Sequence, residues 1–598
     1  MRHREEGPDG WRWLSSRIRE TSLPSCCGER RGAGRCGLAA FAIACGSSNN
    51  NKNNATKAAS AAATAAGGAA TAAGGTAAAG ASGTKAAGTP GAAAATAAAP
   101  GKLGGQLNVG FTGPFAGVDP HNSVYGGAGI VPQVYDYLIR NSIIVPELGI
   151  TPQLATKWEL SADQLTTVFT LRPDAVIAQN TQNVPIRPMD AEDVKQSFDR
   201  VLDPKVASNG YSWASTWIDK YEAVDKTTFS LTTKKPYAWL TNNVGNNLES
   251  AIVPREWLAS PDIKKTAVGS GPFILQSVEE GGQALFKKNP NYWDKGKPYI
   301  DTYSIRAFAD QTTFRTAFSS GQLDAYSASN VDEGKELQSA KKGTQFYTDP
   351  GFGFNSFWMN TKVKPWDDQR IRRAVWRAMN PQEYIQLIAH SDGVRIGLVS
   401  YAMKQYALPD DELNKLAPFD IQQAKQLLQA AGQPNLTFNF QHPTSSVVPD
   451  YVNIFVRQMQ AAGITAKPEP SDAGTWVAGY FSNKLTASLS LNQEYSTPEA
   501  TLNWYKTNGV FGNNHYDTGF SDPEVDAALD KAASTIDEQA RIKAYQDAQR
   551  LIISKDPPFW NFFGVKVYTL AAPEVQNYPH GIGANLGYYQ FRNISLNR

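Results

Sequence analysis

The order of apolar and polar residues predicts strands and helices in the part of the chain that follows residue 104. The segment QLNVGF, at residues 106–111, alternates apolar and polar side chains, which is typical of a β-strand. The segment MDAEDVKQSFDRVLDP places Val194 and Phe198 on one helical face, and Asp190 stands at the expected N-cap. The pattern therefore indicates a strand and, later, an amphipathic helix.

Strand and helix patterns interleave along the rest of the chain. Residues 165–173 and 227–236 are typical of strands that end at Pro or Lys. Residues 420–432 and 450–463 repeat apolar side chains at helical spacing, and both end at a glycine, which is a frequent signal at the C-terminus of a helix. This alternation predicts the α/β fold class.

The first 103 residues have a different composition. Residues 46–103 are mainly Ala, Gly, Thr, Ser and Asn, and because they have almost nothing to bury we expect a disordered, flexible linker. Before them, the apolar run GLAAFAIA at 37–44 has eight residues. A bilayer-spanning helix needs about 20. With Arg30, Arg31 and Arg35 ahead of it, the run is typical of the core of a signal peptide.

Charge and motifs exclude several classes of function. The 598 residues carry a formal net charge of +2, and residues 1–44 alone carry +3, so the remaining chain lacks the basic surface that nucleic acid requires. The chain has no G-x-S-x-G or H-E-x-x-H segment, and all four cysteines precede residue 46. No two of the six His have the spacing of neighbours on a helix, so we expect no metal site and no cofactor.

Several segments resemble, in order, one family of extracytoplasmic binding proteins. They are PQLATKWELSADQLTTVFTLRP, PMDAEDVKQSFDRVLDP, KKPYAWL, VGSGPFIL with LFKKNPNYWDKGKPYID, SGQLDAYSAS, WDDQRIRRAVWRAMN and FSDPEVDAALDKAAS. The family is the peptide/nickel group (family 5) of the solute-binding proteins of bacterial ABC importers, which includes the oligopeptide- and dipeptide-binding proteins. The resemblance covers residues 104–598. It fails at AVIAQNTQNVPIRPM, where we expect a surface loop to change more than the fold.

The resemblance implies a two-lobed, periplasmic-binding-protein-like α/β fold of the cluster C type, with an extra inserted domain and a hinge cleft. The implied division is a signal peptide at 1–45, a linker at 46–103, lobe I at 104–149, 268–356 and 559–598, the inserted domain at 150–267, and lobe II at 357–558.

The residues around Cys45 carry a second resemblance. The segment AIAC at 42–45 is similar to the lipobox of bacterial lipoproteins, although Ala42 replaces the usual Leu and the leader before it is long. The resemblance implies that Cys45 becomes a lipid anchor, since two acyl chains hold a protein firmly to a membrane. The protein would then lie outside the cell, on the outer face of the cytoplasmic membrane.

The family resemblance also implies which segments contact a solute. In lobe II these are GFGFNSFWMNTK and NQEYSTPEATLNW, and alternation directs only about half of the first segment toward the pocket. Glu494 stands where oligopeptide binders have the Asp that pairs with the α-amine of a peptide. The alternative for Glu494 is a solvated carboxylate, or one paired with a Lys or Arg of the protein. The candidate contacts are Phe115, His121, Tyr125, Tyr211, Trp213, Asn355, Phe357, Trp358, Met359, Asn492, Glu494 and Tyr495.

The leading interpretation is a lipid-anchored, non-enzymatic receptor that binds a peptide or a related solute in the cleft and delivers it to an ABC permease. We expect a monomer whose partners are the solute, the permease and the membrane. An extracellular hydrolase of wall peptides or glycans stays open, because a catalytic pair of carboxylates has no sequence signature. A sensor that binds solute without transport, and a metal chelate as the solute, also stay open.

Overall fold

The expected alternation of strands and helices is confirmed in the computed structural model, which describes residues 102–598 with some gaps. The gaps are 113–116, 123–128, 143, 146–148, 247, 280–281, 445–448, 473–474, 477, 480–481, 483, 493–496, 508–517 and 582–589. The expected signal peptide, its Cys45 and the linker up to residue 101 lie outside the described residues. All described residues belong to one compact unit.

Two four-stranded sheets share the first hydrophobic core. One has the order β1 (Gln106–Thr112), β11 (Thr302–Phe308), β10 (Gln283–Lys288) and β9 (Phe273–Val278), with β1 parallel to β11. The other is antiparallel and has the order β5 (Ala155–Leu160), β6 (Thr166–Leu171), β8 (Thr228–Thr233) and β7 (Ile218–Ala223). Strands β6 and β8 are the strands expected at 165–173 and 227–236. The sheets bury Val109 and Phe229 in one continuous core.

Helix α2 (Ala191–Val201) packs on the second of these sheets. Its Phe198 stacks on Phe229 of β8, with ring centroids 5.5 Å apart. The predicted N-cap is confirmed, because the Asp190 carboxylate accepts hydrogen bonds from the backbone N–H groups of Glu192 and Asp193. Asp193 in turn accepts one from the Asp190 N–H, which completes a capping box.

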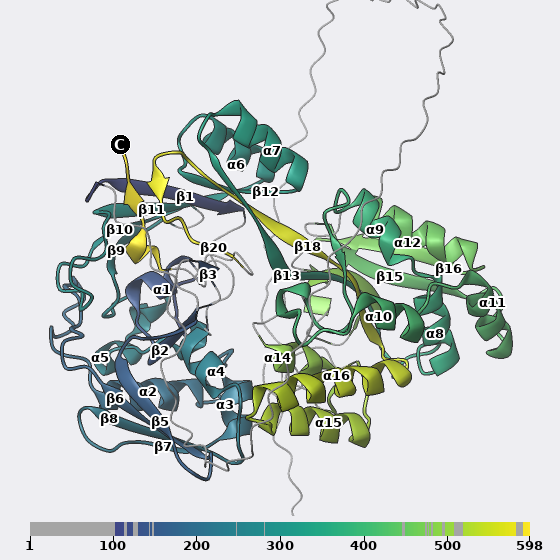
Figure 1. Cartoon of the computed structure of the whole chain (residues 1–598), viewed down its shortest axis with the longest axis horizontal. Helices are drawn as coiled ribbons and strands as arrows, with labels where there is room; N and C mark the ends of the chain where they lie inside the picture. The colour runs from purple at the N-terminus through teal and green to yellow at the C-terminus, as the bar shows by residue number, and fades with distance from the viewer. Residues whose placement is uncertain are drawn as a thin grey trace, which may run out of the picture. The chain divides into compact units, whose positions relative to one another are not determined.

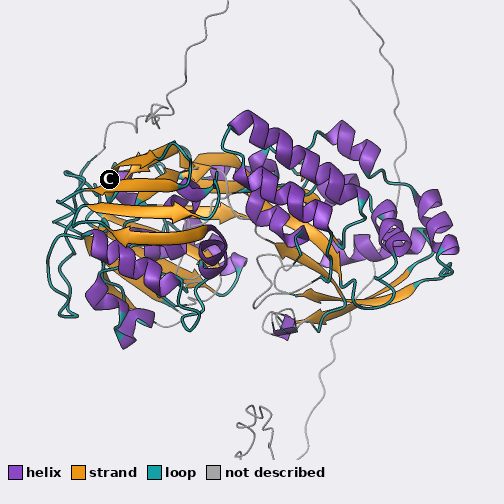
Figure 2. Ribbon diagram, turned by 90° about the horizontal axis from the view of Figure 1, so that it is seen from below, coloured by secondary structure: helices purple, strands orange, loops and turns teal. Residues whose placement is uncertain are grey.

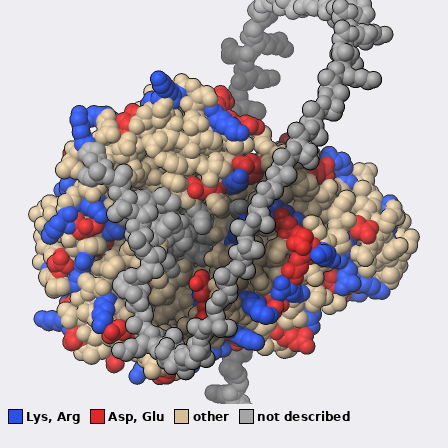
Figure 3. Space-filling model, in the orientation of Figure 1, with Lys and Arg blue, Asp and Glu red and all other residues tan. Residues whose placement is uncertain are grey.

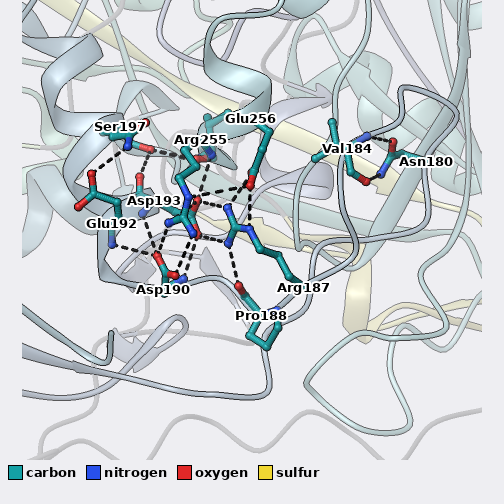
Figure 4. A network of polar contacts seen from close by, with 12 residues as sticks. Asn180, Val184, Arg187, Pro188, Asp190, Glu192, Asp193, Ser197, Arg255 and Glu256 are labelled. Atoms are coloured by element: carbon teal, nitrogen blue, oxygen red, sulfur yellow. Dashed lines mark hydrogen bonds and ion pairs between the residues drawn. The ribbon is translucent and has the colours of Figure 1, made fainter. Parts of the chain in front are cut away.

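The loop that departs from the family pattern is tied to the start of α2 (Figure 4). Arg187 donates two hydrogen bonds to Asp193, at 2.8 and 2.6 Å, and two to Glu256 of α5 (Arg255–Leu258), at 2.9 and 2.7 Å. Arg255 adds hydrogen bonds to the Asp190 carboxylate at 2.6 and 3.1 Å. The loop therefore carries a charge network that ties it to the start of α2 and to α5.

The second part of the molecule is built on a long sheet. Its order is β12 (Ala325–Ala328), β18 (Phe559–Ala571), β13 (Gln345–Met359), β17 (Ala487–Asn492), β15 (Thr437–Pro443) and β16 (Thr465–Ser471), and β14 (Val394–Arg395) pairs with β18. Figure 1 shows β13 and β18 as two long neighbouring strands. The first residues of β18 pair with the end of β13, so they belong to the same sheet as residues expected in lobe II. The lobe boundary at residue 558 stays a prediction.

Five longer helices pack with this sheet around the second hydrophobic core. They are α8 (Gln369–Ala378), α11 (Ile421–Ala430), α12 (Pro449–Ala461), α15 (Pro523–Ser534) and α16 (Glu538–Ser554). Helices α11 and α12 are those expected at 420–432 and 450–463. Figure 2 shows helices over one side of the strands in this part.

The remaining elements are short or form a third, smaller core. That core contains β12, α6 (Gln311–Ser319) and α7 (Val331–Ala340). The other helices and strands are α1 (Val131–Val134), β2 (Ile139–Ser142), β3 (Ile144–Val145), β4 (Gly149–Pro152), α4 (Leu240–Asn246), α9 (Pro381–Leu387), α10 (Asp410–Leu416), α14 (Pro498–Leu502), β19 (Val575–Gln576), β20 (His580–Gly581) and β21 (Ser595–Leu596). Short 3₁₀ turns cover Leu248–Ser250, Pro261–Lys264, Tyr401–Met403, Asn503–Tyr505 and Phe591–Asn593.

Candidate functional site

The two lobe II segments expected to contact a solute lie on neighbouring strands. Strand β13 runs antiparallel to β17, with Asn355 opposite Leu491 and Phe357 opposite Leu489. The backbone of Asn492 lies at the end of β17, but its side chain is not described, and Glu494 and Tyr495 lie outside the described residues. The fold therefore brings the strand with residues 355–359 beside the strand that leads into the Glu494 segment.

Strand alternation divides the four candidates on β13 between the two faces of the sheet. Phe357 points into the helix-covered core, with its ring 4.7 Å from Phe455 of α12, and is fully buried. Asn355 and Met359 share the face of Phe357, because they lie two residues from it along the strand. Trp358 points to the opposite face, where its Nε1 donates a hydrogen bond of 3.2 Å to Ser490 Oγ. A solute contact by any of the four stays a prediction, and this geometry favours Trp358.

The face that carries Trp358 also carries a row of small polar residues, which we call the polar row: Ser490, Ser356 and Asn561. Ser356 of β13 lies opposite Ser490 of β17 on one side and opposite Asn561 of β18 on the other. The two hydroxyl oxygens are 3.3 Å apart, and all three residues are fully buried. Sequence reasoning missed this row, although the apolar strand segment FWNFF contains a single polar residue, Asn561.

Aromatic side chains flank the polar row. Phe559 of β18 lies opposite Trp358, and the ring of Trp504 packs against Phe559 at 4.7 Å. Trp476 donates a hydrogen bond of 3.0 Å to Ser488 Oγ, opposite Trp358 on β17. Neutral hydrogen-bonding groups between aromatic walls are the mixture found in binding sites for small organic molecules.

A buried carboxylate follows the Glu494 segment in sequence. Thr497 caps α14 by accepting a hydrogen bond from the Ala500 N–H, and Glu499 is in the first turn of this helix. The Glu499 carboxylate accepts hydrogen bonds from Trp217 Nε1 at 2.9 Å and from the Tyr237 hydroxyl at 2.6 Å. Burial raises the pKa of Glu499 to about 7, because these hydrogen bonds only partly offset the loss of solvent.

Trp217 and Tyr237 come from the segment expected as the inserted domain, so Glu499 joins that domain to the lobe II elements. Neighbouring contacts also join these two parts of the chain. The Ala238 N–H donates to the Ala533 carbonyl at 3.1 Å, and Trp239 Nε1 donates to the Tyr545 hydroxyl of α16 at 2.9 Å. Trp239 packs against both large hydrophobic cores. Sequence reasoning missed Glu499, because an acidic residue in the first turn of a helix is usually exposed.

His121 and Trp213, which come from separate segments, line the same small pocket. His121 is fully buried, and the 3.0 Å contact of its Nε2 with the Ala251 carbonyl places the ring proton on Nε2. Burial lowers the pKa of His121 to about 4. His121 Nδ1, Trp213 Nε1 and Ser250 Oγ, all buried atoms at this pocket, have no hydrogen-bond partner among the described residues. Tyr211 lies on the same short helix as Trp213, α3 (Tyr211–Trp217), whereas Phe115 and Tyr125 lie outside the described residues.

Charges and membrane-spanning potential give no further site in the described part of the chain. Within it, no group of three or more His, Cys, Asp and Glu side chains is placed to hold a metal ion. No described helix combines the length and the apolar character that crossing a bilayer requires. On the face drawn in Figure 3, basic and acidic side chains are interspersed.

Comparison with known proteins places this geometry among solute receptors. The model of the bacterial extracellular solute-binding proteins, family 5, matches residues 149–513, more than half of the chain. Heme-binding protein A of Haemophilus influenzae is 24% identical over 491 residues, which cover 78% of this chain and 87% of that protein. The glutathione-binding protein GsiB of Salmonella typhi is 24% identical over 436 residues, which cover 69% of this chain and 80% of that protein.

Solved structures show the same fold. The periplasmic binding protein DppA of Helicobacter pylori, in complex with the peptide STSA, superposes with a TM-score of 0.73 at 21% identity and covers 83% of this chain and 99% of that one. The dipeptide-binding protein of Pseudoalteromonas sp. SM9913, in complex with Met-Leu, gives a TM-score of 0.69 at 18% identity, with 82% and 100% covered. The expected periplasmic-binding-protein-like fold is therefore confirmed.

Proposed function

Because this chain belongs to the bacterial extracellular solute-binding proteins, family 5, we propose that it is a receptor that binds a peptide or a related small solute and delivers it to the permease of an ABC importer. The names of two relatives support a peptide. One is named a glutathione-binding protein and another, from Pseudomonas aeruginosa, a di/tripeptide-binding protein. The proposed function involves no covalent chemistry.

The observation that carries the proposal is the polar row between aromatic walls, on the strands where the solute segments were expected. In the proposed arrangement, the solute binds against the Trp358 face of lobe II, and the carboxylate of Glu494 pairs with its ammonium group. Asn492 and Tyr495 complete this side. The other side of the cleft, which closes by a hinge motion, is formed by residues of lobe I and of the inserted domain. These are Phe115, His121 and Tyr125 of lobe I and Tyr211 and Trp213 of the inserted domain.

The proposal includes a lipid anchor at Cys45. An acylated Cys45 followed by the linker at 46–103 would tether the receptor, as a monomer, to the outer face of the cytoplasmic membrane, near the permease. Fractionation of cells that express the Cys45→Ser variant tests this point. The variant is expected in the soluble fraction, and an acylated, membrane-bound variant would contradict the anchor.

The central experiment identifies the solute and then tests Glu494. Mass spectrometry of small molecules that copurify with the full-length protein is expected to find peptides with a free α-amine. Calorimetry then compares the wild type, Glu494→Gln and Glu469→Gln, a control carboxylate on the edge strand β16. Removing one partner of a desolvated charge pair weakens binding by roughly thirty-fold or more. The N-acetylated form of the same peptide should bind both Glu494 forms alike.

Two outcomes would contradict parts of this proposal separately. Equal affinities of wild type and Glu494→Gln for the amine-bearing peptide would remove Glu494 from the site. Hydrolysis of the copurified peptide, or of cell-wall glycans, by the purified protein would contradict a receptor without catalytic activity.

A further inference from the structure

The carboxamide of Asn561 is buried without a hydrogen-bond partner. Asn561 lies on β18 and is fully buried, and neither its Nδ2 nor its Oδ1 has a partner among the described residues. A carboxamide offers two donors and one acceptor oxygen, and burying them unpaired is unfavourable. Some group that is not part of the described chain must therefore satisfy this side chain, or it weakens the folded state.

Two other buried amides show what full pairing looks like. Asn289 donates to the Gly271 carbonyl at 2.8 Å and accepts from the Asn291 N–H at 3.0 Å. Gln153 donates to Gln590 Oε1 at 3.0 Å and accepts from the Tyr137 N–H at 2.9 Å. Of the amides with unpartnered buried atoms in the described segments, only Asn561 lacks a partner at both ends. Its state is thus an exception within this protein.

Packing does not explain an amide at this position. The neighbours of Asn561 along the strand, Trp560 and Phe562, are buried members of the second hydrophobic core. A leucine has nearly the same shape as an asparagine and would fill the position without the cost of desolvation. Packing alone therefore gives no reason for a polar side chain at this position.

The position of Asn561 indicates what binds to it. Asn561 ends the polar row, beside Ser356, and β13 separates it from β17, the strand that leads into the Glu494 segment. No member of the polar row carries a charge. A neutral group that both donates and accepts hydrogen bonds matches this surface, and an amide is such a group.

We propose that Asn561 binds an amide group of the solute, donating from Nδ2 to its carbonyl oxygen and accepting at Oδ1 from its N–H. The solute class is then a peptide or another amide-rich compound. This inference rests on the proposed function and deepens it, because a receptor could bind peptides through Glu494 without using Asn561.

The test uses Asn561→Leu in the full-length protein, with Thr569→Val as a matched control. Thr569 is on the same strand and also has a buried, unpartnered oxygen, but it lies eight residues beyond Asn561, opposite Tyr347. The probe is a casein digest of peptides two to five residues long. Captured peptides are identified by mass spectrometry after gel filtration, and the affinity of the most abundant one is measured by calorimetry. The thermal midpoint of each unliganded protein is measured in parallel.

The expected result is that Asn561→Leu binds the captured peptide about tenfold more weakly or worse, while its unliganded midpoint stays equal or rises. Thr569→Val should bind like the wild type. Should Asn561→Leu fail to fold, Asn561→Ser, which extends the row of serines but lacks the carboxamide, is expected to show the same loss of affinity.

Three results would overturn the inference. Wild-type affinity in Asn561→Leu would show that Asn561 does not contact the peptide, and the proposed function would stand. Wild-type affinity with a lowered midpoint would identify an ordered water as the partner of Asn561. Capture of no peptide by the wild type would contradict the peptide solute itself, and the inference would fall with it.

Discussion

Two buried carboxylates in the first turns of helices have opposite surroundings. The Asp193 side chain, at the start of α2, is 0% exposed, and Glu499, at the start of α14, is 7% exposed. Asp193 accepts hydrogen bonds from the Arg187 guanidinium and from the N–H groups of Asp190 and Arg255. Glu499 meets the neutral donors Trp217 and Tyr237, and within the described ranges no cationic side chain lies at ion-pair distance from it.

The contacts of Asp193 lie within the segment expected as the inserted domain. The contacts of Glu499 instead join that segment to elements expected in lobe II. Hydrogen bonds to Asp193 raise the pKa of Arg187, so the guanidinium stays charged. Among the described residues Glu499 has no cation at ion-pair distance, Lys506 acts on it only through space, and burial raises its pKa to about 7. A buried charge without a counter-charge is costly, so protonation of Glu499 relieves that cost. The Asp193 network is thus a fixed support, whereas the contacts of Glu499, between the segment expected as the inserted domain and elements expected in lobe II, should depend on pH.

Removing Asp193 should give the largest effect. Asp193→Ala removes the acceptor of two Arg187 hydrogen bonds and of two part-buried N–H groups, and leaves Arg187 with Glu256 as its remaining carboxylate. We therefore expect a loss of roughly 3–5 kcal/mol in the free energy of unfolding. Urea denaturation measures the loss, and peptide binding by the folded fraction should not change. Asp199→Ala is the control on the same helix, because the exposed Lys195–Asp199 pair should contribute less than about 1 kcal/mol. Equal losses in the two variants would contradict the comparison.

Neutralising Glu499 should change the pH dependence of stability. Its folded pKa, about 7, lies above the usual value of 4.5, so the unfolded chain releases the proton more readily. The contribution of Glu499 to the free energy of unfolding is therefore complete below pH 4.5. It is lost as the pH rises through 7, by roughly 3 kcal/mol in total. Glu499→Gln keeps the shape of the side chain and should remove this loss.

The measurement is urea denaturation of the wild type and Glu499→Gln from about pH 5 to about pH 8. The difference between the two curves isolates Glu499 from every other titrating group. Glu469→Gln on the exposed edge strand β16 controls for the loss of one charge. Parallel curves for the wild type and Glu499→Gln would show that Glu499 does not titrate in this range.

The helices and strands could be predicted from the sequence. The sequence could not show which side of the sheet each side chain faces, or which distant residues it contacts. The N-cap Asp190 and the apolar spacing of α2 follow from contacts a few residues apart, which the sequence displays directly. The alternation in FNSFWM divides its side chains into two sets without showing which set faces the core. Phe357 is in the core because Phe455 packs on it from almost a hundred residues away.

The burial of Glu499 was equally hidden from the sequence, because Trp217, which covers it, is 282 residues away. In the sequence, Asn561 is a single polar residue in an apolar strand. The strand register, which the sequence does not show, places Ser356 beside it. The family resemblance supplied the segments of the candidate site, and the pairing of β17, β13 and β18 added the polar row.

The smallest effect is expected at the exposed rim of the same junction. Lys235 pairs with Asp530 of α15 at 3.0 Å, but their side chains are 48% and 37% exposed, and Lys506 also pairs with Asp530. Lys235→Ala should therefore cost less than about 1 kcal/mol in the free energy of unfolding, and less still at high salt. Urea denaturation compares it with Lys531→Ala, a neighbouring exposed lysine. A cost as large as the pH-dependent loss at Glu499 would mean that surface charge holds the two domains together. The small cost that we expect would instead place that role on the buried contacts of Glu499 and Trp239.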